Sequence, residues 1–80
     1  MRVRVERSFI TTAAGTRVLS PRPESHVLEA NSLRGALVSF IEGERGRLLG
    51  TVSELTDVRA VATAWVDGRL YVLAAEPAPD

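Results

Sequence analysis

The N-terminal segment alternates between apolar and polar positions. Val3 and Val5 fall on one side of an extended chain, and Arg2 and Arg4 fall on the other. A period of two with β-branched residues predicts a strand, which continues through the run Phe-Ile-Thr-Thr at 9–12. This strand would bury the valines and expose the arginines.

A turn and a short return strand are expected next. Residues 13–16 read Ala-Ala-Gly-Thr, and residues 17–19 read Arg-Val-Leu. The run Ser-Pro-Arg-Pro at 20–23 breaks the pattern, because proline lacks an N–H group and restricts the residue before it. We therefore expect a surface loop over residues 20–26.

The last third of the chain carries the clearest signal. Two apolar runs, residues 58–66 and 70–74, flank Asp67 and Gly68. An Asp-Gly pair between apolar runs predicts a β-hairpin, because a type I′ turn needs positive φ at both central residues. Both runs are apolar at most positions, so we expect the hairpin to be covered on both faces, by the core or by a partner.

The middle of the chain supports two interpretations. Leu33, Ala36, Leu37, Phe40 and Ile41 have helical spacing, and Asn31 or Ser32 could cap a helix. The other interpretation places strands at 36–41 and 47–55, since Gly35 disfavours a helix and Val38 and Phe40 favour a strand. The four glycines between 35 and 50 tilt the choice toward the strands.

The sequence therefore predicts a mainly β fold, a small β-barrel or sandwich with a C-terminal hairpin. The alternative is an α+β fold with one helix at about 32–42 packed on an antiparallel sheet. Residues 1–76 would form a single small domain, and residues 77–80 a frayed tail. Eighty residues leave no room for a second domain.

Composition adds an expectation about assembly. Ten basic and ten acidic residues give zero net charge, which argues against a general polyanion binder, and cysteine is absent. A small core without disulfides or metal is often stabilised by oligomerisation, so we expect a homo-oligomer. No run is apolar enough to cross a membrane and no signal peptide is evident, so the expected location is cytoplasmic.

Residues suited to catalysis are sparse. His26 is the single histidine, the carboxylates sit mostly at expected turns, and no serine lies in a nucleophile motif. Gly43 and Gly46 are too close together, and too near Glu42 and Glu44, for a phosphate-binding loop. We expect no enzyme activity, no cofactor and no metal site.

Charge is distributed unevenly along the chain. Residues 1–22 carry five arginines and one acid, whereas residues 41–80 carry four arginines and seven acids. The arginines could bind an anion, RNA or DNA, could pair head to tail with the acidic half of another copy, or could form a solvated face on which Arg2 protects the strand edge. The candidates for anion or nucleic-acid contact are Arg2, Arg4, Arg17 and Arg22.

The hairpin supplies the candidates for a protein interface. Trp65 lies two residues before the expected turn, and Tyr71 three residues after it. Large aromatic side chains on so apolar a hairpin favour packing in the core or against a partner over stacking on bases. The expected interface residues are Trp65, Val66, Tyr71 and Leu73.

Residues 33–75 resemble a PRC-barrel domain, the small β-barrel of photosynthetic reaction-centre H subunits and ribosome-maturation proteins. The resemblance is carried by Leu-Arg-Gly-Ala-Leu-Val at 33–38, by Gly43, and by Leu-Gly-Thr-Val-Ser-Glu-Leu at 49–55. The loop between them is about three residues longer than usual, and residues 1–32 have no counterpart. The resemblance implies a non-enzymatic adaptor that docks on a protein or ribonucleoprotein.

A shorter segment, residues 32–37, looks like the opening of the first helix in CRISPR-associated RAMP proteins. That resemblance implies RNA binding on a ferredoxin-like fold and would favour the helical interpretation. We expect a non-catalytic assembly or adaptor module that self-associates or contacts another protein. The alternative is a small RNA- or DNA-binding domain that uses the N-terminal arginines.

Overall fold

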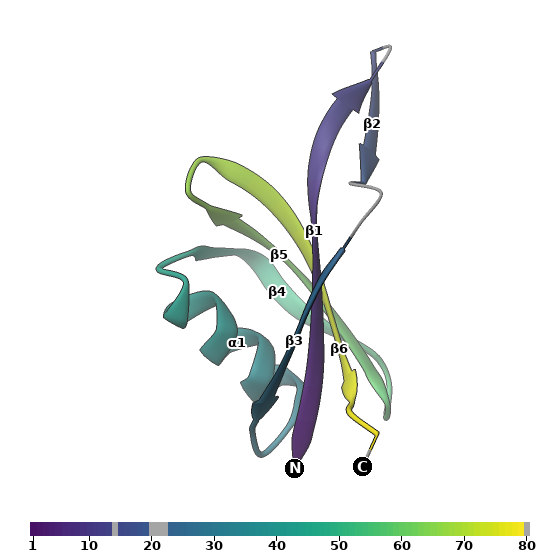
Figure 1. Ribbon diagram of the computed structural model, residues 1–80, viewed down its shortest axis with the longest axis vertical. Helices are drawn as coiled ribbons and strands as arrows, with labels where there is room; N and C mark the ends of the chain where they lie inside the picture. Colours follow the sequence, from purple (N-terminus) through teal and green to yellow (C-terminus); the bar gives the residue numbers. More distant parts are fainter. Residues whose placement is uncertain (14, 20–22, 80) are drawn as a thin grey trace.

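One twisted antiparallel sheet with a helix on one face makes up the part of the chain that the structure describes, residues 1–13, 15–19 and 23–79 (Figure 1). The structure is a computed structural model. In chain order the elements are β1 (Arg2–Ala13), β2 (Thr16–Leu19), β3 (Glu24–Glu29), α1 (Leu33–Gly43), β4 (Arg47–Thr56), β5 (Arg59–Val66) and β6 (Arg69–Pro77).

The strand order is β2-β1-β6-β5-β4, and β3 pairs with the first half of β1 on the side away from β6. The mainly β prediction is confirmed, but the barrel is wrong, because the sheet stays open. The sheet stays open because the connection from β3 to β4 runs over one of its faces. These strands lie toward opposite edges, and α1 joins them by crossing one face, where it packs on β1, β4, β5 and β6.

The helix settles the ambiguity in the middle of the chain. The structure has α1 where the favoured interpretation placed a strand at 36–41, and the alternative helix at about 32–42 is correct. The Ser32 hydroxyl accepts a hydrogen bond from the Gly35 amide at 2.9 Å, which caps the first turn. A Cβ at Gly35 would lie 3.1 Å from that hydroxyl, so this glycine leaves room for the cap. Cap and amphipathic spacing together outweigh the strand preference of Val38 and Phe40.

The C-terminal hairpin is confirmed. Val66 pairs with Arg69 across a turn in which Asp67 has φ 50° and Gly68 has φ 75°. Both angles are positive, as a type I′ turn requires. The turn thereby sets the register of β5 and β6 along their whole length.

The first strand is also confirmed, with Val3 and Val5 fully buried. Two expectations around it change. The expected loop at 20–26 gives way to β3 from Glu24 onward, while residues 20–22 lie outside the described residues. At the other end of the chain, β6 includes Pro77, and the Ala78 amide donates to the Arg2 carbonyl at 3.0 Å. The chain is thus paired over the first two residues of the segment assigned to a tail.

The core lies between α1 and the sheet. Leu33, Leu37 and Ile41 of the helix pack on a sheet surface that consists largely of small side chains. Five of the buried core residues are alanines: Ala36, Ala60, Ala62, Ala64 and Ala75. These small residues let the helix approach the sheet closely, and they also keep the apolar area buried there modest.

Candidate functional site

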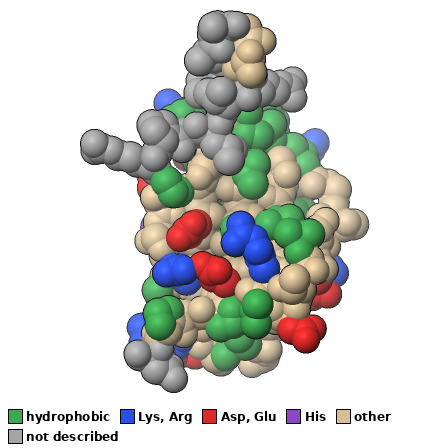
Figure 2. All heavy atoms as spheres, turned by 90° about the vertical axis from the view of Figure 1, so that its right-hand side faces the viewer, with side chains coloured by type: hydrophobic (Ala, Val, Ile, Leu, Met, Phe, Trp, Pro, Cys, Tyr) green, Lys and Arg blue, Asp and Glu red, His purple; other side chains and the backbone are tan. Residues whose placement is uncertain are grey.

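The two faces of the sheet differ in what covers them. Opposite residues on paired strands share a face, so the register assigns each side chain to the helix-covered face or to the other, here called the helix-free face. No described element packs across the helix-free face, and Figure 2 views the molecule from that side.

Half of the helix-free face is apolar. Cross-strand pairs Trp65–Leu70, Thr63–Val72 and Val61–Ala74 join β5 to β6, and Leu49 of β4 lies opposite Thr63. Trp65 is 47% exposed, and the others are partly exposed. We call this set the hairpin patch: Leu49, Val61, Thr63, Trp65, Leu70, Val72 and Ala74. It presents branched and aromatic side chains to solvent on a continuous surface.

The other half carries charges that pair with one another, and we call Arg4, Glu6, Arg59 and Glu76 the charged belt. The Arg4 guanidinium donates to the Glu76 carboxylate, and its Nε lies 3.7 Å from Glu6 Oε1. Arg59 Nη1 lies 3.9 Å from Glu76 Oε2. The hydrogen bond from Arg4 holds the pKa of Glu76 below its usual value of 4.5. Figure 2 shows acidic and basic side chains side by side across the middle of this face.

The four expected interface residues separate between the two faces. Trp65 is exposed in the hairpin patch, whereas Tyr71 is half-buried on the helix-covered face. Val66 is 4% exposed and Leu73 is 1% exposed, and both belong to the core beneath α1. Successive side chains along a strand point to opposite faces. Val66 is one residue from Trp65 and Leu73 is three residues from Leu70, so both point to the face opposite the hairpin patch. Of the four, Trp65 is the side chain that reaches solvent on the helix-free face.

The expected anion-binding arginines do not form one described cluster. Arg2 is exposed opposite Glu29, and Arg4 is engaged in the charged belt. Arg17 belongs to β2 by its backbone, with its side chain outside the described residues, and Arg22 lies outside them altogether. Nucleic-acid binding by these residues stays a prediction.

A second cluster, centred on Arg7, was not anticipated from the sequence. Its guanidinium lies 5.1 Å from the Tyr71 ring centroid and 5.7 Å from that of Phe40. It contacts Glu24 at 2.8 Å and Glu44 at 3.6 Å, and the hydrogen bond to Glu24 keeps the pKa of that carboxyl below its usual value. The guanidinium is thus enclosed by partners from β3, β6 and α1. It ties these elements to β1, and its charge is already compensated.

The signal for this cluster was present in the alternation of the first strand. Arg7 shares the inward register of Val3 and Val5, so an arginine at that position needed partners on the covered side. His26, expected in a solvated loop, lies in β3 and packs against Phe40, with the ring centroids 5.1 Å apart and the ring planes tilted by 51°. Its Nε2 is 3.7 Å from Glu24.

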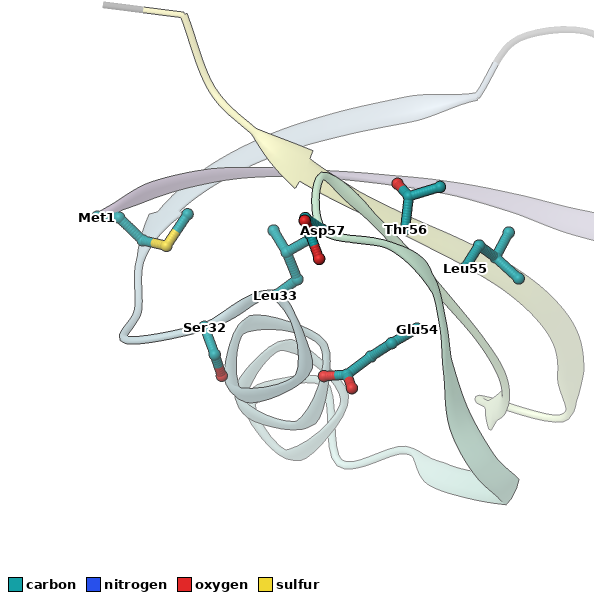
Figure 3. Close-up of a pocket in the computed structure, with 7 residues that line it drawn as sticks. All are labelled: Met1, Ser32, Leu33, Glu54, Leu55, Thr56 and Asp57. Carbon is teal, nitrogen blue, oxygen red and sulfur yellow. The ribbon is translucent and has the colours of Figure 1, made fainter.

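A cavity of about 550 Å³ opens at the start of α1 (Figure 3). Its lining combines Ser32 and Leu33 with Glu54 and Asp57. Figure 3 shows Glu54 reaching from β4 toward the helix, where its carboxylate lies 3.6 Å from Arg34 Nε. The Ser32 hydroxyl is occupied as the helix cap. These groups therefore serve local structure.

Two further searches over the described residues give negative findings. No group of three or more histidine, cysteine, aspartate or glutamate side chains in residues 1–13, 15–19 and 23–79 is arranged to hold a metal ion. The described helix α1 is too short to cross a membrane. When the chain is compared with protein-family models, with curated proteins and with solved structures, nothing matches.

Proposed function

We propose that the protein is a non-catalytic assembly module that associates with a second copy of itself through the helix-free face. The observation that carries this proposal is the β5–β6 hairpin, which is apolar on both faces while α1 covers only one. Trp65, Leu70 and Val72 lie on the uncovered surface, and the free energy falls when a partner removes them from water.

The size of the face supports a dimer. Five strands at the usual spacing of about 4.8 Å span roughly 24 Å, and six to eight residues per strand span roughly 20–27 Å. Two such faces in contact would bury on the order of 1,000–1,200 Å², which is near the lower limit for specific interfaces. The alanine-rich core gives the single chain a further reason to associate, because its own buried apolar area is small.

The charges of the face favour a second copy as the partner. A two-fold interface brings the same surface from both copies together, so a strongly charged face would repel itself. In the charged belt, Arg4 and Arg59 are balanced by Glu6 and Glu76 within each chain. The charged belt can therefore approach its copy with its own charges compensated, and it offers a nucleic acid no free cation for phosphate. Arg47 lies on the same face opposite Trp65, on the edge strand β4, so a dimer must leave it in water or place it beside an acid of the second copy.

The test compares two identical substitutions at different places. Val72→Arg introduces a charge into the hairpin patch, and Val58→Arg introduces the same charge at an aliphatic residue that is 59% exposed in the turn between β4 and β5. Size-exclusion chromatography with light scattering should give twice the chain mass for the unmodified protein and for Val58→Arg. Val72→Arg should give the mass of one chain, with an unchanged circular dichroism spectrum.

The same run discriminates the nucleic-acid alternative. Absorbance at 260 and 280 nm should match protein alone at low and at high salt. A monomer at all concentrations, or a dimer that survives Val72→Arg, contradicts the proposal. A monomer with excess absorbance at 260 nm that high salt removes would support nucleic-acid binding by the N-terminal arginines instead.

A further inference from the structure

The outer edge of β4 differs along its length. Beyond Leu49 the pairing with β5 is interrupted until Ser53, and Gly50 has φ 73°. Near this irregular part, Arg34 Nη2 donates to the Val52 carbonyl at 3.5 Å, so a side chain of α1 occupies the backbone there. Bulges and long basic side chains are common means of protecting an exposed strand edge.

Among the described residues, the first part of β4 has neither a bulge nor a side chain of α1 on its backbone, although its own Arg47 is exposed at the edge. Residues 47–49 pair regularly with residues 63–65 of β5, and β4 is the last strand on its side of the sheet. Among the described residues no strand pairs with the outer edge of residues 47–49, so part of their backbone N–H and C=O groups is free to pair with an added strand.

A cavity of about 320 Å³ lies beside this open edge. Val38, Ile41 and Glu42 line it from the helix, and Gly46, Arg47 and Leu48 line it from the strand. Val38 and Glu42 follow Arg34 at four-residue spacing, so they lie on the side of α1 that faces β4. The cavity could take one aliphatic side chain from a strand that pairs with residues 47–49.

We propose that this part of β4 is a strand-addition site for an extended segment of another protein, in which aliphatic and acidic residues alternate. Strand addition takes its affinity from main-chain hydrogen bonds and its specificity from pockets for alternate side chains. One aliphatic side chain of the added strand enters the cavity beside Val38 and Leu48. The side chains next to it lie on the helix-free side beside Arg47.

Arg47 sets the charge of the partner. It is exposed, and no carboxylate of the described residues lies within 4.0 Å of it. Its neighbour Arg45 is also exposed. Opposite charges side by side on adjacent strands are favourable, so an acidic residue next to the aliphatic one fits this edge. The main-chain pairing and the cavity use the edge of the sheet, whereas Arg47 lies on the helix-free face opposite Trp65. The charge test is therefore made on the Val72→Arg variant, in which the proposed dimer cannot cover Arg47.

The experiment uses the full chain labelled with ¹⁵N and a short peptide, acetylated and amidated, in which leucine alternates with aspartate. Saturable shifts are expected for the amides of residues 47–49 and for Val38. A matched peptide with N-methylated leucines cannot form the main-chain bonds, and it should bind at least about tenfold more weakly. Equal affinity for both peptides would show simple hydrophobic capture and would overturn strand addition.

Two pairs of variants test the cavity and the charge. Val38→Glu places a carboxylate in the cavity and should weaken binding about tenfold, whereas Ser39→Glu on an exposed side of the helix should not. Made in the Val72→Arg variant, Arg47→Glu should weaken binding of the leucine–aspartate peptide. The same protein should bind a peptide in which leucine alternates with lysine more tightly than Val72→Arg alone does.

Three results would overturn the proposal. The first is no saturation at millimolar peptide, and the second is shifts confined to the helix-free face. The third is concentration-dependent protection of amides 47–49 without peptide, which would assign the edge to a second copy.

Discussion

The two faces of the sheet carry side chains of opposite character. Ala62 and Ala64 of β5 face the helix, while Thr63 and Trp65 of the same strand face away from it. The covered face is built of small residues because α1 packs directly on it. Between residues 60 and 65 of β5, the bulkier side chains are therefore placed on the helix-free face. Along β5 the larger apolar side chains Val61 and Trp65 therefore lie outside the core of the single chain, whereas Val66 and Leu73 of the same hairpin belong to it.

The largest expected effect comes from one leucine on each face of β6. Leu73→Ala removes a side chain that is 1% exposed and should lower the free energy of unfolding by about 2–5 kcal/mol. Leu70→Ala removes a partly exposed side chain and should cost less than about 1 kcal/mol in dilute solution. Urea unfolding at low protein concentration measures both.

The same pair of variants separates stability from assembly. Leu70→Ala should weaken self-association, because Leu70 lies beside Trp65 in the hairpin patch. Leu73→Ala should leave the interface intact wherever the protein is still folded. Equal losses of stability for both variants would show that the two faces do not differ in the way described.

A smaller effect is expected from two glycines at the end of the helix. A Cβ at Gly46 would lie 2.7 Å from Val66 Cγ2 and 3.0 Å from the Trp65 carbonyl, so Gly46→Ala should cost about 1–3 kcal/mol through overpacking. Gly43 ends α1 and a Cβ there would meet nothing within 4 Å. Gly43→Ala should be neutral or stabilise the protein by up to about 1 kcal/mol.

Thermal unfolding of both glycine variants tests how tightly the covered face is packed. If Gly46→Ala is as stable as the unmodified protein, the helix can move away from β5 without loss. The helix-covered face would then accept added side-chain volume more readily than its alanine content indicates.

Local patterns predicted β1 and the C-terminal hairpin well, but they did not predict β3, which begins inside the expected loop at 20–26. The alternation around Val3 and Val5, and the Asp67-Gly68 turn, depend on neighbours within a few residues, and both are confirmed. The choice between helix and strand at 36–41 failed because Gly35 was counted against a helix, whereas its amide donates the capping hydrogen bond to Ser32 and a Cβ there would crowd that hydroxyl. The open sheet could not be predicted either, because closure depends on which strands pair across the whole chain.

The candidate site was predicted only in part, because part of it depends on pairing between distant strands. The two-sided apolarity of the hairpin was visible in the sequence, but the face of each residue requires the register, which placed Val66 and Leu73 in the core. The charged belt joins Arg4 to Glu76, 72 residues away along the chain. No local pattern indicates such a pair, whereas the inward position of Arg7 could have been read from the alternation.

The smallest expected effect concerns one glutamate on each face. The pKa of Glu76 is lowered by its hydrogen bond from Arg4, and that of Glu24 by its hydrogen bond from Arg7. A lowered pKa in the folded state stabilises the protein above the usual glutamate value of 4.5, and this stabilisation is lost as the pH falls through the lowered pKa. Glu76→Gln and Glu24→Gln should each flatten the decline of the melting temperature in that acidic range.

Protein concentration distinguishes the two glutamates. Protonation of Glu76 leaves Arg4 and Arg59 without their shared carboxylate on the helix-free face, so acid should dissociate the proposed dimer as well as destabilise the chain. Glu24 lies toward the helix-covered face, where its protonation affects only folding. Melting curves are recorded between about pH 3 and 7 at two protein concentrations. The difference in melting temperature between Glu76→Gln and the unmodified protein should depend on the concentration, whereas the difference for Glu24→Gln should not. An identical response of both variants at every concentration would mean that the charged belt lies outside any interface.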